Sequence, residues 1–248
     1  MQETSDNSEM VTSPKAPLRG SGAMFDNMAK RYDLLNRLMS FGVDKRWRKR
    51  TVLSLGLAPG NNVLDLATGT GDLAIDIAKR SPGVTVVGVD PSIKMLEIGI
   101  AKIEKAKLGD RITMEQGIGE DLPFEDNTFD AVTIAFGIRN CTDRPQALRE
   151  MRRVVRPGGR VGVLELSEPK GGFMAPFARF HIHQVIPRIG SWLSGARKYR
   201  YLQESIADFP SAEDFSKIIE DCGLEMLDLI SFSFGSCHLY LASVPENK

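Results

Sequence analysis

The sequence has few of the residues that bind metal ions or form disulfides. It contains three cysteines and three histidines, and these form no C-x-x-C pair and no mixed Cys/His cluster. An odd number of scattered cysteines is typical of proteins from reducing compartments. We therefore expect a cytoplasmic protein without disulfides and without a bound metal ion.

The sequence also lacks an excess of charge of either sign and lacks long apolar runs. Lys plus Arg and Asp plus Glu both number 32, which argues against a protein that binds nucleic acid through bulk positive charge. No stretch of 18 apolar residues occurs, and the first residues do not resemble a signal peptide. A chain of 248 residues is long enough for one α/β domain with an insertion.

The pattern along the chain predicts one domain after a short tail. Residues 1–23 are rich in small polar residues and predict a flexible tail, so a single domain is expected over 24–248, beginning with a helical region at 24–58. Strands then alternate with helices, which predicts an α/β fold with a parallel sheet covered on both faces. The last two apolar runs are too close together for a crossover and should pair antiparallel. Residues 169–201 interrupt the alternation and read as an inserted helical cap. The expected strands are 63–66, 82–90, 112–116, 129–135, 160–166, 224–232 and 238–244.

The stretch 63–75 (VLDLATGTGDLAI) organises the rest of the chain. A buried strand leads into a turn with Gly69 and Gly71, and a helix follows. Glycine permits positive φ and lets a ligand approach the backbone closely, while the free N–H groups of the next helix face whatever lies over the turn. These features predict a nucleotide pocket.

Two cofactors fit this pocket, and a plain turn without ligand is a third interpretation. Gly69, Gly71 and Ala74 fit the dinucleotide pattern G-x-G-x-x-A, and Asp90 stands where a ribose-binding carboxylate belongs. However, Asp65 lies within the strand and Asp72 follows the turn. Carboxylates suit the sulfonium and ammonium of S-adenosylmethionine (SAM) better than the two phosphates of NAD. The residues favour SAM, although Asp72 could instead cap its helix.

Four separated motifs resemble those of the ubiquinone/menaquinone C-methyltransferase family. They are residues 32–47 (YDLLNRLMSFGVDKRW), 136–140 (FGIRN), 153–159 (RVVRPGG) and 199–206 (YRYLQESI). The third motif occurs in many methyltransferases, whereas the other three together are specific to the family. The resemblance implies a class I SAM-dependent methyltransferase, a Rossmann-like fold with a seven-stranded sheet of order 3-2-1-4-5-7-6 and an antiparallel seventh strand. It also implies methyl transfer to a ring carbon of a polyprenylated quinol.

The resemblance carries cofactor contacts over to several positions. Thr70 and Asp90 are expected to contact SAM, Asp90 through the ribose hydroxyls, together with Asp65, Gly69 and Gly71 of the glycine-rich stretch. The adenine is expected beside Ile118 and Gly119, in the loop after the third strand, and beside Ala135. Relatives often have polar residues at 118 and 135, so a contact with the adenine edge would fall to the backbone or to Glu120.

The chemistry is expected at the carboxyl edge of the sheet, where ligands of open α/β sheets bind. Arg139 and Asn140 follow the fourth strand. Methylation of a ring carbon requires a phenolate, which a guanidinium stabilises, and Asn140 can orient a water molecule or a quinol oxygen. The alternative is that Arg139 pairs with Asp143 and only braces the loop.

The predicted cap supplies candidates for the substrate pocket. Phe177, His181, Tyr199 and Tyr201 are expected to line a prenyl or quinol site, although each could simply pack within the cap. Apolar residues flanked by arginines suit a membrane interface. We therefore expect peripheral contact with the inner face of the membrane, and the same surface could also form a homodimer.

Three other functions fit part of the pattern. A methyltransferase for another lipophilic molecule would share the glycine-rich turn. A NAD-binding oxidoreductase would need a Tyr-x-x-x-Lys pair, but Gln203 and Ser205 stand four residues after Tyr199 and Tyr201. A catalytically silent adaptor would not need Arg139 and Asn140. The ring type, the prenyl length and the proton acceptor are not specified by the residues.

Overall fold

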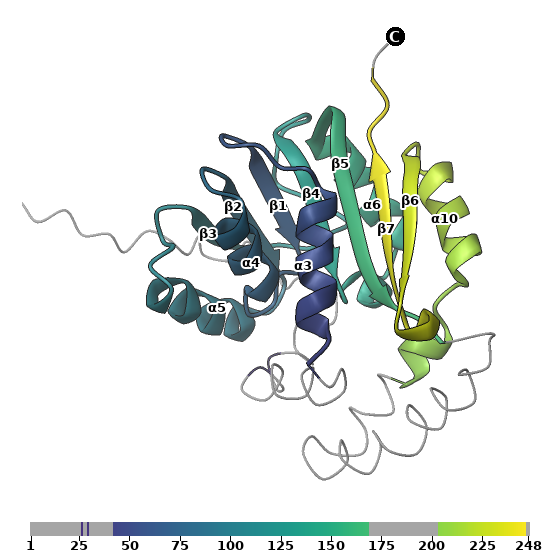
Figure 1. Cartoon of the computed structure of the whole chain (residues 1–248), viewed down its shortest axis with the longest axis horizontal. Helices are drawn as coiled ribbons and strands as arrows, with labels where there is room; N and C mark the ends of the chain where they lie inside the picture. The colour runs from purple at the N-terminus through teal and green to yellow at the C-terminus, as the bar shows by residue number, and fades with distance from the viewer. Residues whose placement is uncertain (1–25, 27–28, 30–41, 169–202, 247–248) are drawn as a thin grey trace, which may run out of the picture.

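The computed structural model describes Asp26, Ala29 and residues 42–168 and 203–246. Its centre is a seven-stranded sheet with the order β3-β2-β1-β4-β5-β7-β6 (Figure 1). Strand β7 is antiparallel to both neighbours, and the remaining pairs are parallel. The predicted order and the antiparallel last strand are confirmed. The strands are β1 (Asn62–Leu66), β2 (Thr85–Asp90), β3 (Ile112–Gln116), β4 (Phe129–Ala135), β5 (Val155–Leu166), β6 (Glu225–Phe232) and β7 (Cys237–Ser243).

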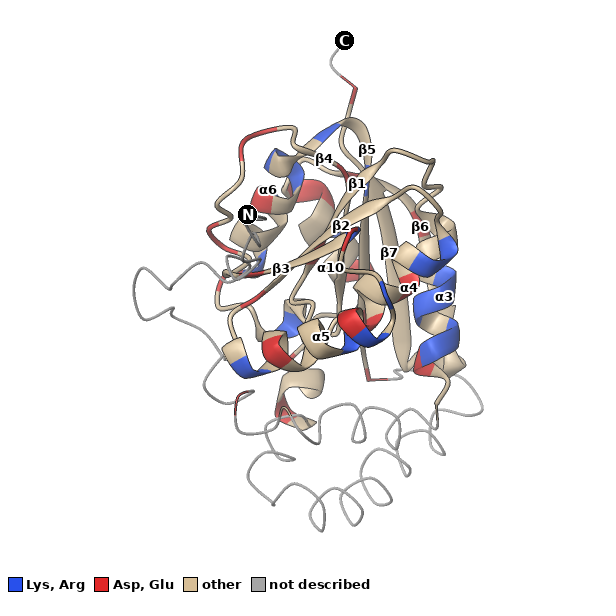
Figure 2. Cartoon of the chain, turned by 90° about the vertical axis from the view of Figure 1, so that its left-hand side faces the viewer, with Lys and Arg blue, Asp and Glu red and all other residues tan. Residues whose placement is uncertain are grey.

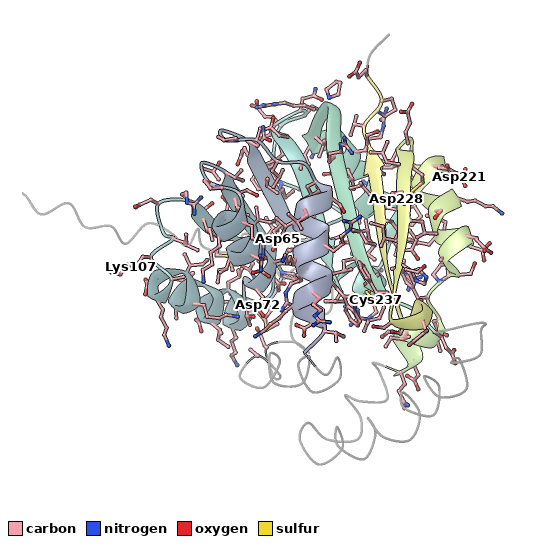
Figure 3. All side chains as sticks on the ribbon, viewed as in Figure 1. Asp65, Asp72, Lys107, Asp221, Asp228 and Cys237 are labelled. Carbon is pink, nitrogen blue, oxygen red and sulfur yellow. The ribbon has the colours of Figure 1, made fainter. Side chains whose placement is uncertain are left out.

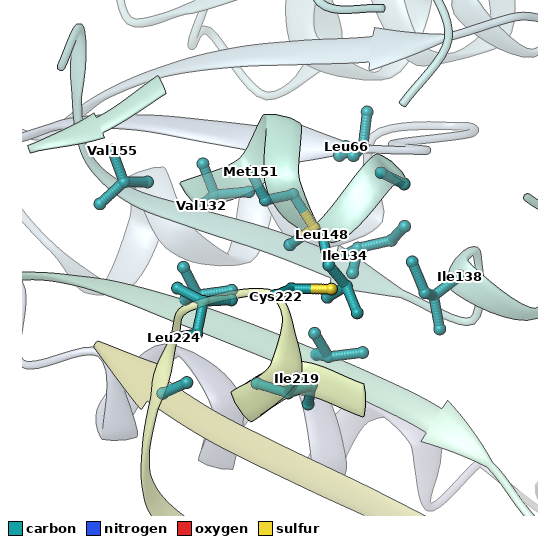
Figure 4. Packing of buried hydrophobic residues seen from close by; sticks show 14 of the residues in the cluster. Leu66, Val132, Ile134, Ile138, Leu148, Met151, Val155, Ile219, Cys222 and Leu224 are labelled. Carbon is teal, nitrogen blue, oxygen red and sulfur yellow. The ribbon is translucent and has the colours of Figure 1, made fainter. Parts of the chain in front are cut away.

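Helices cover both faces of this sheet, as predicted. Two hydrophobic clusters divide the helices between the faces: one includes residues of α3, α4 and α5, and the other, shown in part in Figure 4, includes residues of α6 and α10. Apolar side chains that alternate along the central strands supply both clusters, because successive residues of a strand point to opposite faces. The described helices are α3 (Asp44–Ser54), α4 (Asp72–Arg80), α5 (Ile93–Lys105), η1 (Ile138–Asn140), α6 (Arg144–Val154), α10 (Ala212–Asp221) and η3 (Ser233–Gly235).

Short polar residues begin three of these helices. The Ser92 hydroxyl accepts the Met95 N–H, Asp143 accepts the Gln146 N–H, and Ser211 accepts the Asp214 N–H. Each bond satisfies one of the N–H groups that a first turn leaves unpaired.

Strand β5 begins earlier than the sequence pattern indicates. It was expected from Arg160, after the helix-stopping Pro157 and its glycines, but it starts at Val155. Val155 pairs with Phe129, and an irregularity then shifts the register so that Arg160 pairs with Ala131. The extra residues are accommodated because Gly158 adopts φ +76°. Pairing with β4 therefore continues on both sides of Gly158.

Three predicted regions are outside the described residues, wholly or in large part. These are the tail 1–23, the first part of the helical region 24–58, and the cap 169–201, and the domain boundaries stay predictions. Helix α3 lies within the predicted helical region. No helix in the described part of the chain is long and apolar enough to cross a membrane. Among the same residues, no group of His, Cys, Asp or Glu is arranged to hold a metal ion.

Candidate active site

The carboxyl ends of the parallel strands lie along one edge of the sheet, the lower edge in Figure 1, beside η3 and the start of α3. Between β1 and α4 runs the glycine turn, which we define as residues 67–71. Ala67, Gly69 and Gly71 have φ of 51°, 55° and 75°. Gly71 occupies the N-cap position of α4, where no side chain caps the helix. Of the N–H groups in the first turn of α4, that of Ala74 donates to the buried carboxylate of Asp65, so a side chain of β1 ties the start of the helix to the strand before it.

Asp90, at the end of β2, is held against this turn. One carboxylate oxygen accepts the Gly69 N–H at 2.9 Å and the other accepts the Ser92 N–H at 2.9 Å. Burial raises the pKa of Asp90 to about 6, although the two hydrogen bonds oppose the shift. Each oxygen can accept a further hydrogen bond, so the carboxylate has the capacity to accept from the two hydroxyls of a ribose.

Asp65 lies deeper, in β1, and serves the turn itself. It accepts the Thr68 hydroxyl at 2.7 Å and the Thr133 hydroxyl of β4 at 2.9 Å. Burial raises its pKa to about 6, and the charge of Asp90 adds to the shift. The side chain is 1% exposed, so any influence on a cation over the turn is electrostatic. Asp65 and Asp72 (Figure 3) lie in the strand before the glycine turn and in the helix after it.

Thr70 and Asp72 form contacts with α5 and α3. The Lys102 ammonium donates to the Thr70 hydroxyl at 3.0 Å and pairs with the Asp72 carboxylate. A nitrogen of Arg48 lies 3.4 Å from Asp72 and 2.7 Å from Asp44. Figure 2 shows how many basic residues α3 carries next to α4. The structure shows Asp72 in this ion-pair network, whereas the helix-capping interpretation is not borne out by any cap bond.

The loop expected beside the adenine is tied through Glu120 to the segment that follows η1. Ile118 forms an isolated antiparallel bridge with Asp121, and Gly119 is buried near Leu66. Glu120 accepts the N–H of Thr142 at 2.7 Å. Its carboxylate therefore supports the loop after η1, and the backbone near Ile118 is the better candidate for adenine recognition. Ala135, at the end of β4, is partly buried.

Arg139 lies in η1, directly after β4, with a side chain that is 6% exposed. Its Nη1 forms an ion pair with Glu165 of β5 and donates to the Phe136 carbonyl at 2.8 Å. The sequence suggested Asp143 as the partner of a structural brace; this was wrong, because Asp143 accepts the Gln146 N–H at the start of α6. Arg139 Nε is buried and has no hydrogen-bond partner among the described residues.

The backbone of this turn is bent tightly. Phe136 adopts φ +58°, and its carbonyl also accepts from the Asn140 amide at 3.4 Å. A Cβ on Gly137 would lie 2.5 Å from the Ala67 Cβ. Non-glycine residues with positive φ are uncommon and gather at functional sites. Here Ala67 and Phe136 directly follow the adjacent strands β1 and β4. The glycine turn and the turn that carries Arg139 therefore lie in contact, with Gly137 against Ala67.

Sequence reasoning missed a polar group at the ends of β5 and β7. Glu165 has no exposed surface. The Ser167 hydroxyl donates to the Gly235 carbonyl at 2.7 Å and therefore accepts from His238 Nδ1, 2.9 Å away. Burial lowers the pKa of His238. Glu165 and Ser167 could have been found from one signal: they are polar residues at the carboxyl end of an otherwise apolar strand, next to the ligand edge.

The structure thus brings together Asp65, Gly69, Thr70, Gly71 and Asp90 around the glycine turn, with Arg139 and Asn140 on the neighbouring turn. The predicted substrate residues Phe177, His181, Tyr199 and Tyr201 lie outside the described residues. Their roles, and those of the described site residues, stay predictions.

Comparisons with known proteins show the family of this chain. In sequence, the chain is 45% identical over 218 residues to a ubiquinone/menaquinone biosynthesis C-methyltransferase from Geobacter sulfurreducens, covering 88% of this chain and 85% of the relative. It is 45% identical over 219 residues to a demethylmenaquinone methyltransferase from Thermus thermophilus, covering 87% and 98%.

Solved structures support the fold. One is a SAM-dependent methyltransferase from Aquifex aeolicus, with a TM-score of 0.63 and 18% identity, covering 88% of this chain and 98% of that chain. Another is the [4+2]-cyclase SpnF, with a TM-score of 0.69 and 17% identity, covering 91% and 95%. At these identities the likeness shows the fold alone. A model of the ubiE/COQ5 methyltransferase family matches residues 16–243, and the chain belongs to that family.

Proposed function

We propose that this methyltransferase transfers the methyl group of SAM to a ring carbon of a polyprenylated quinol. Demethylmenaquinol is the proposed acceptor, and 2-methoxy-6-polyprenyl-1,4-benzoquinol is a second candidate. The names of the Geobacter and Thermus relatives support this class of substrate. The ring carbon gains the methyl group and releases its hydrogen as a proton, while sulfur keeps the electron pair of the broken bond. No oxidant or reductant is required.

The observation that carries the proposal is the position of Asp90. Its two oxygens are fixed by the N–H groups of Gly69 and Ser92, so the carboxylate is oriented before a ligand arrives. The residues fit SAM: Asp90 would accept the ribose hydroxyls, the glycine turn would let the methionine end approach the backbone closely, and Asp65 would add a negative field. Bound SAM supplies a methyl group activated by a positively charged sulfur.

The acceptor would bind beside Arg139. Deprotonation of a quinol hydroxyl makes the adjacent ring carbon nucleophilic, and the resulting oxyanion needs a positive partner. The Nε–H of Arg139, which has no partner among the described residues, is such a donor, because a buried donor without a partner is unfavourable by about 1–3 kcal/mol until an acceptor meets it. Asn140, on the same turn, would orient the second oxygen or a water molecule.

The function is tested with purified protein, SAM carrying a CD3 group, and demethylmenaquinone reduced to its quinol. Mass spectrometry should detect a product heavier by one CD3 group in place of one ring hydrogen. The oxidised quinone is the control and should not react, because it has no hydroxyl to ionise. Methylation of a sterol or a phospholipid but not of either quinol would replace the proposal with the broader methyltransferase function.

Membrane contact is a separate part of the proposal. A polyprenyl tail resides in a bilayer, so the enzyme should meet its acceptor at the inner membrane face. Sedimentation with vesicles of phosphatidylglycerol and phosphatidylethanolamine, with and without demethylmenaquinol, measures this. A protein that stays in the supernatant in both cases, yet methylates a long-tailed quinol at full rate, would contradict membrane contact.

A further inference from the structure

Glu165 is the one carboxylate of β5. It is buried near the carboxyl end of the strand, at the edge of the sheet where the acceptor would bind. Its side chain has no exposed surface. Burying an ionised carboxylate is unfavourable by several kcal/mol unless charge and hydrogen bonds compensate. A glutamate here therefore needs a role that an apolar residue of similar size could not fill.

The carboxylate binds Arg139 at two places. Oε1 accepts from Arg139 Nη1 and also from the Leu166 N–H at 2.8 Å, and Oε2 accepts the backbone N–H of Arg139 at 3.2 Å. Glu165 thus fixes both the main chain of η1 and the guanidinium that extends from it.

These contacts occupy one nitrogen of the Arg139 guanidinium and leave another available. Nη1 is used by Glu165 and by the Phe136 carbonyl, whereas the buried Nε–H has no partner in the described part of the chain. We propose that Glu165 is a positioning residue that aims the Nε side of Arg139 at the acceptor oxygen. The inference rests on the proposed function, since the acceptor is the quinol.

The neighbours of Glu165 make Arg139 the group that balances its charge. Burial raises the pKa of Cys237 well above its usual value, and burial and the charge of Glu165 raise that of Tyr240. Burial lowers the pKa of His238, the residue beside Glu165 on β7. These three side chains are therefore neutral near pH 7, and none of them balances the charge of Glu165.

Glutamine cannot replace this carboxylate. All three donors to Glu165 are N–H groups, so the amide nitrogen of a glutamine would face a donor in either orientation. Aspartate keeps the charge but is shorter by one methylene. Both variants should let the guanidinium move, and a misplacement of about 1 Å lowers a rate roughly 10²-fold.

The experiment compares E165Q, E165D, R139A and the double variant R139A/E165Q. We expect kcat to fall about 10²-fold in E165Q and E165D, with SAM affinity unchanged. R139A/E165Q should be no slower than R139A, because Glu165 acts through Arg139. Parental kcat in a folded E165D, or a double variant slower by the product of the single effects, would overturn the inference.

A matched control separates positioning from stability. Glu150 likewise accepts from an arginine, Arg153, and from a backbone N–H, that of Leu122, and neither partner is a predicted site residue. E150Q should lower the Tm and leave kcat unchanged. If E165Q behaves as E150Q does, Glu165 only holds the fold and the inference is wrong.

A readout without turnover makes the result independent of the quinol assignment. The NMR signal of the Arg139 Nε–H, assigned with R139K, should be sharp and protected in the parent and broadened in E165D. An unchanged signal would overturn the inference. An inactive parent with the expected signal change would instead refute the proposed acceptor while Glu165 keeps its role toward Arg139.

Discussion

Gly99, in the middle of α5, lies against the backbone of Thr70 in the glycine turn. A Cβ at this position would be 3.3 Å from the Thr70 carbonyl carbon and 2.4 Å from Met114 Cε. The methionine end can move, but the backbone of the glycine turn can do so only if the ligand site shifts. The absence of a side chain on α5 therefore helps to set the shape of the cofactor site.

Replacement of Gly99 by alanine should destabilise the protein and weaken SAM binding. Alanine gains up to about 1 kcal/mol of helix propensity, whereas overpacking typically costs about 1–3 kcal/mol, so the packing term should win. Urea unfolding and calorimetry measure the two effects. Gly109→Ala is the control, because a Cβ at that position would have no atom within 4 Å, and unchanged SAM affinity in G99A would show that the contact does not shape the site.

Asp90→Ala should lower SAM affinity strongly. Each charge-assisted hydrogen bond to a ribose hydroxyl contributes about 1.5–3 kcal/mol, so the loss should exceed tenfold in Kd. Calorimetry on the folded variant measures it, with Asp110→Asn as a control on an exposed carboxylate. Parental affinity in D90A would refute the assignment of Asp90 to the cofactor, and tight NADH binding by the parent would favour the oxidoreductase alternative.

Removal of the Asp65 carboxylate should change how stability depends on pH. The pKa of Asp65 is 3.8 when unperturbed and about 6 in the folded protein, because of burial. Between these values the folded state holds a proton that the unfolded chain has released. The contribution of Asp65 to the free energy of unfolding is therefore greatest below pH 3.8 and falls as pH rises through about 6. Unfolding measurements on D65N should show parent stability declining relative to the variant by on the order of 2–3 kcal/mol from pH 4 to 7. A pH-independent difference would contradict this.

The same two carboxylates should make SAM binding pH-dependent in the opposite sense. A cationic ligand favours ionised Asp65 and Asp90, whose pKa values are both about 6. Affinity should fall as pH drops through 6, and binding near pH 6 should release protons, which calorimetry detects in buffers of different ionisation enthalpy. S-adenosylhomocysteine, which lacks the charge on sulfur, should show a weaker dependence. Equal pH profiles for both ligands would mean that the carboxylates do not sense the sulfonium.

Arg139→Ala should slow methyl transfer far more than it weakens SAM binding. Loss of one preorganised oxyanion partner typically lowers kcat by about 10²–10³-fold, and lysine should restore little because it lacks the planar fork. Single-turnover rates with demethylmenaquinol measure the effect on folded protein. The variant should also have a lower Tm, since Glu165 is left buried without its partner. Near-parental methylation by folded R139A would disprove the proposed mechanism.

Much of the architecture was predictable because it follows from local patterns. Strands β3 and β4 have the predicted bounds, since the pattern of apolar residues along a strand records which face is buried. The turn at Gly69 and Gly71 was recognisable because positive φ favours one residue type. The sheet order came from the family resemblance, and the structure confirms it.

The partners of the buried charges were decided by tertiary structure. Arg139 pairs with Glu165, 26 positions away, and not with nearby Asp143, because parallel strands β4 and β5 bring their carboxyl ends to one edge. Ser167 meets His238 only because β7 runs antiparallel beside β5. A local pattern reports burial and conformation, but it does not report which distant charge lies opposite. The sequence by itself therefore determined the elements, the glycine turn and the family, while the folded sheet determined how Arg139 is held.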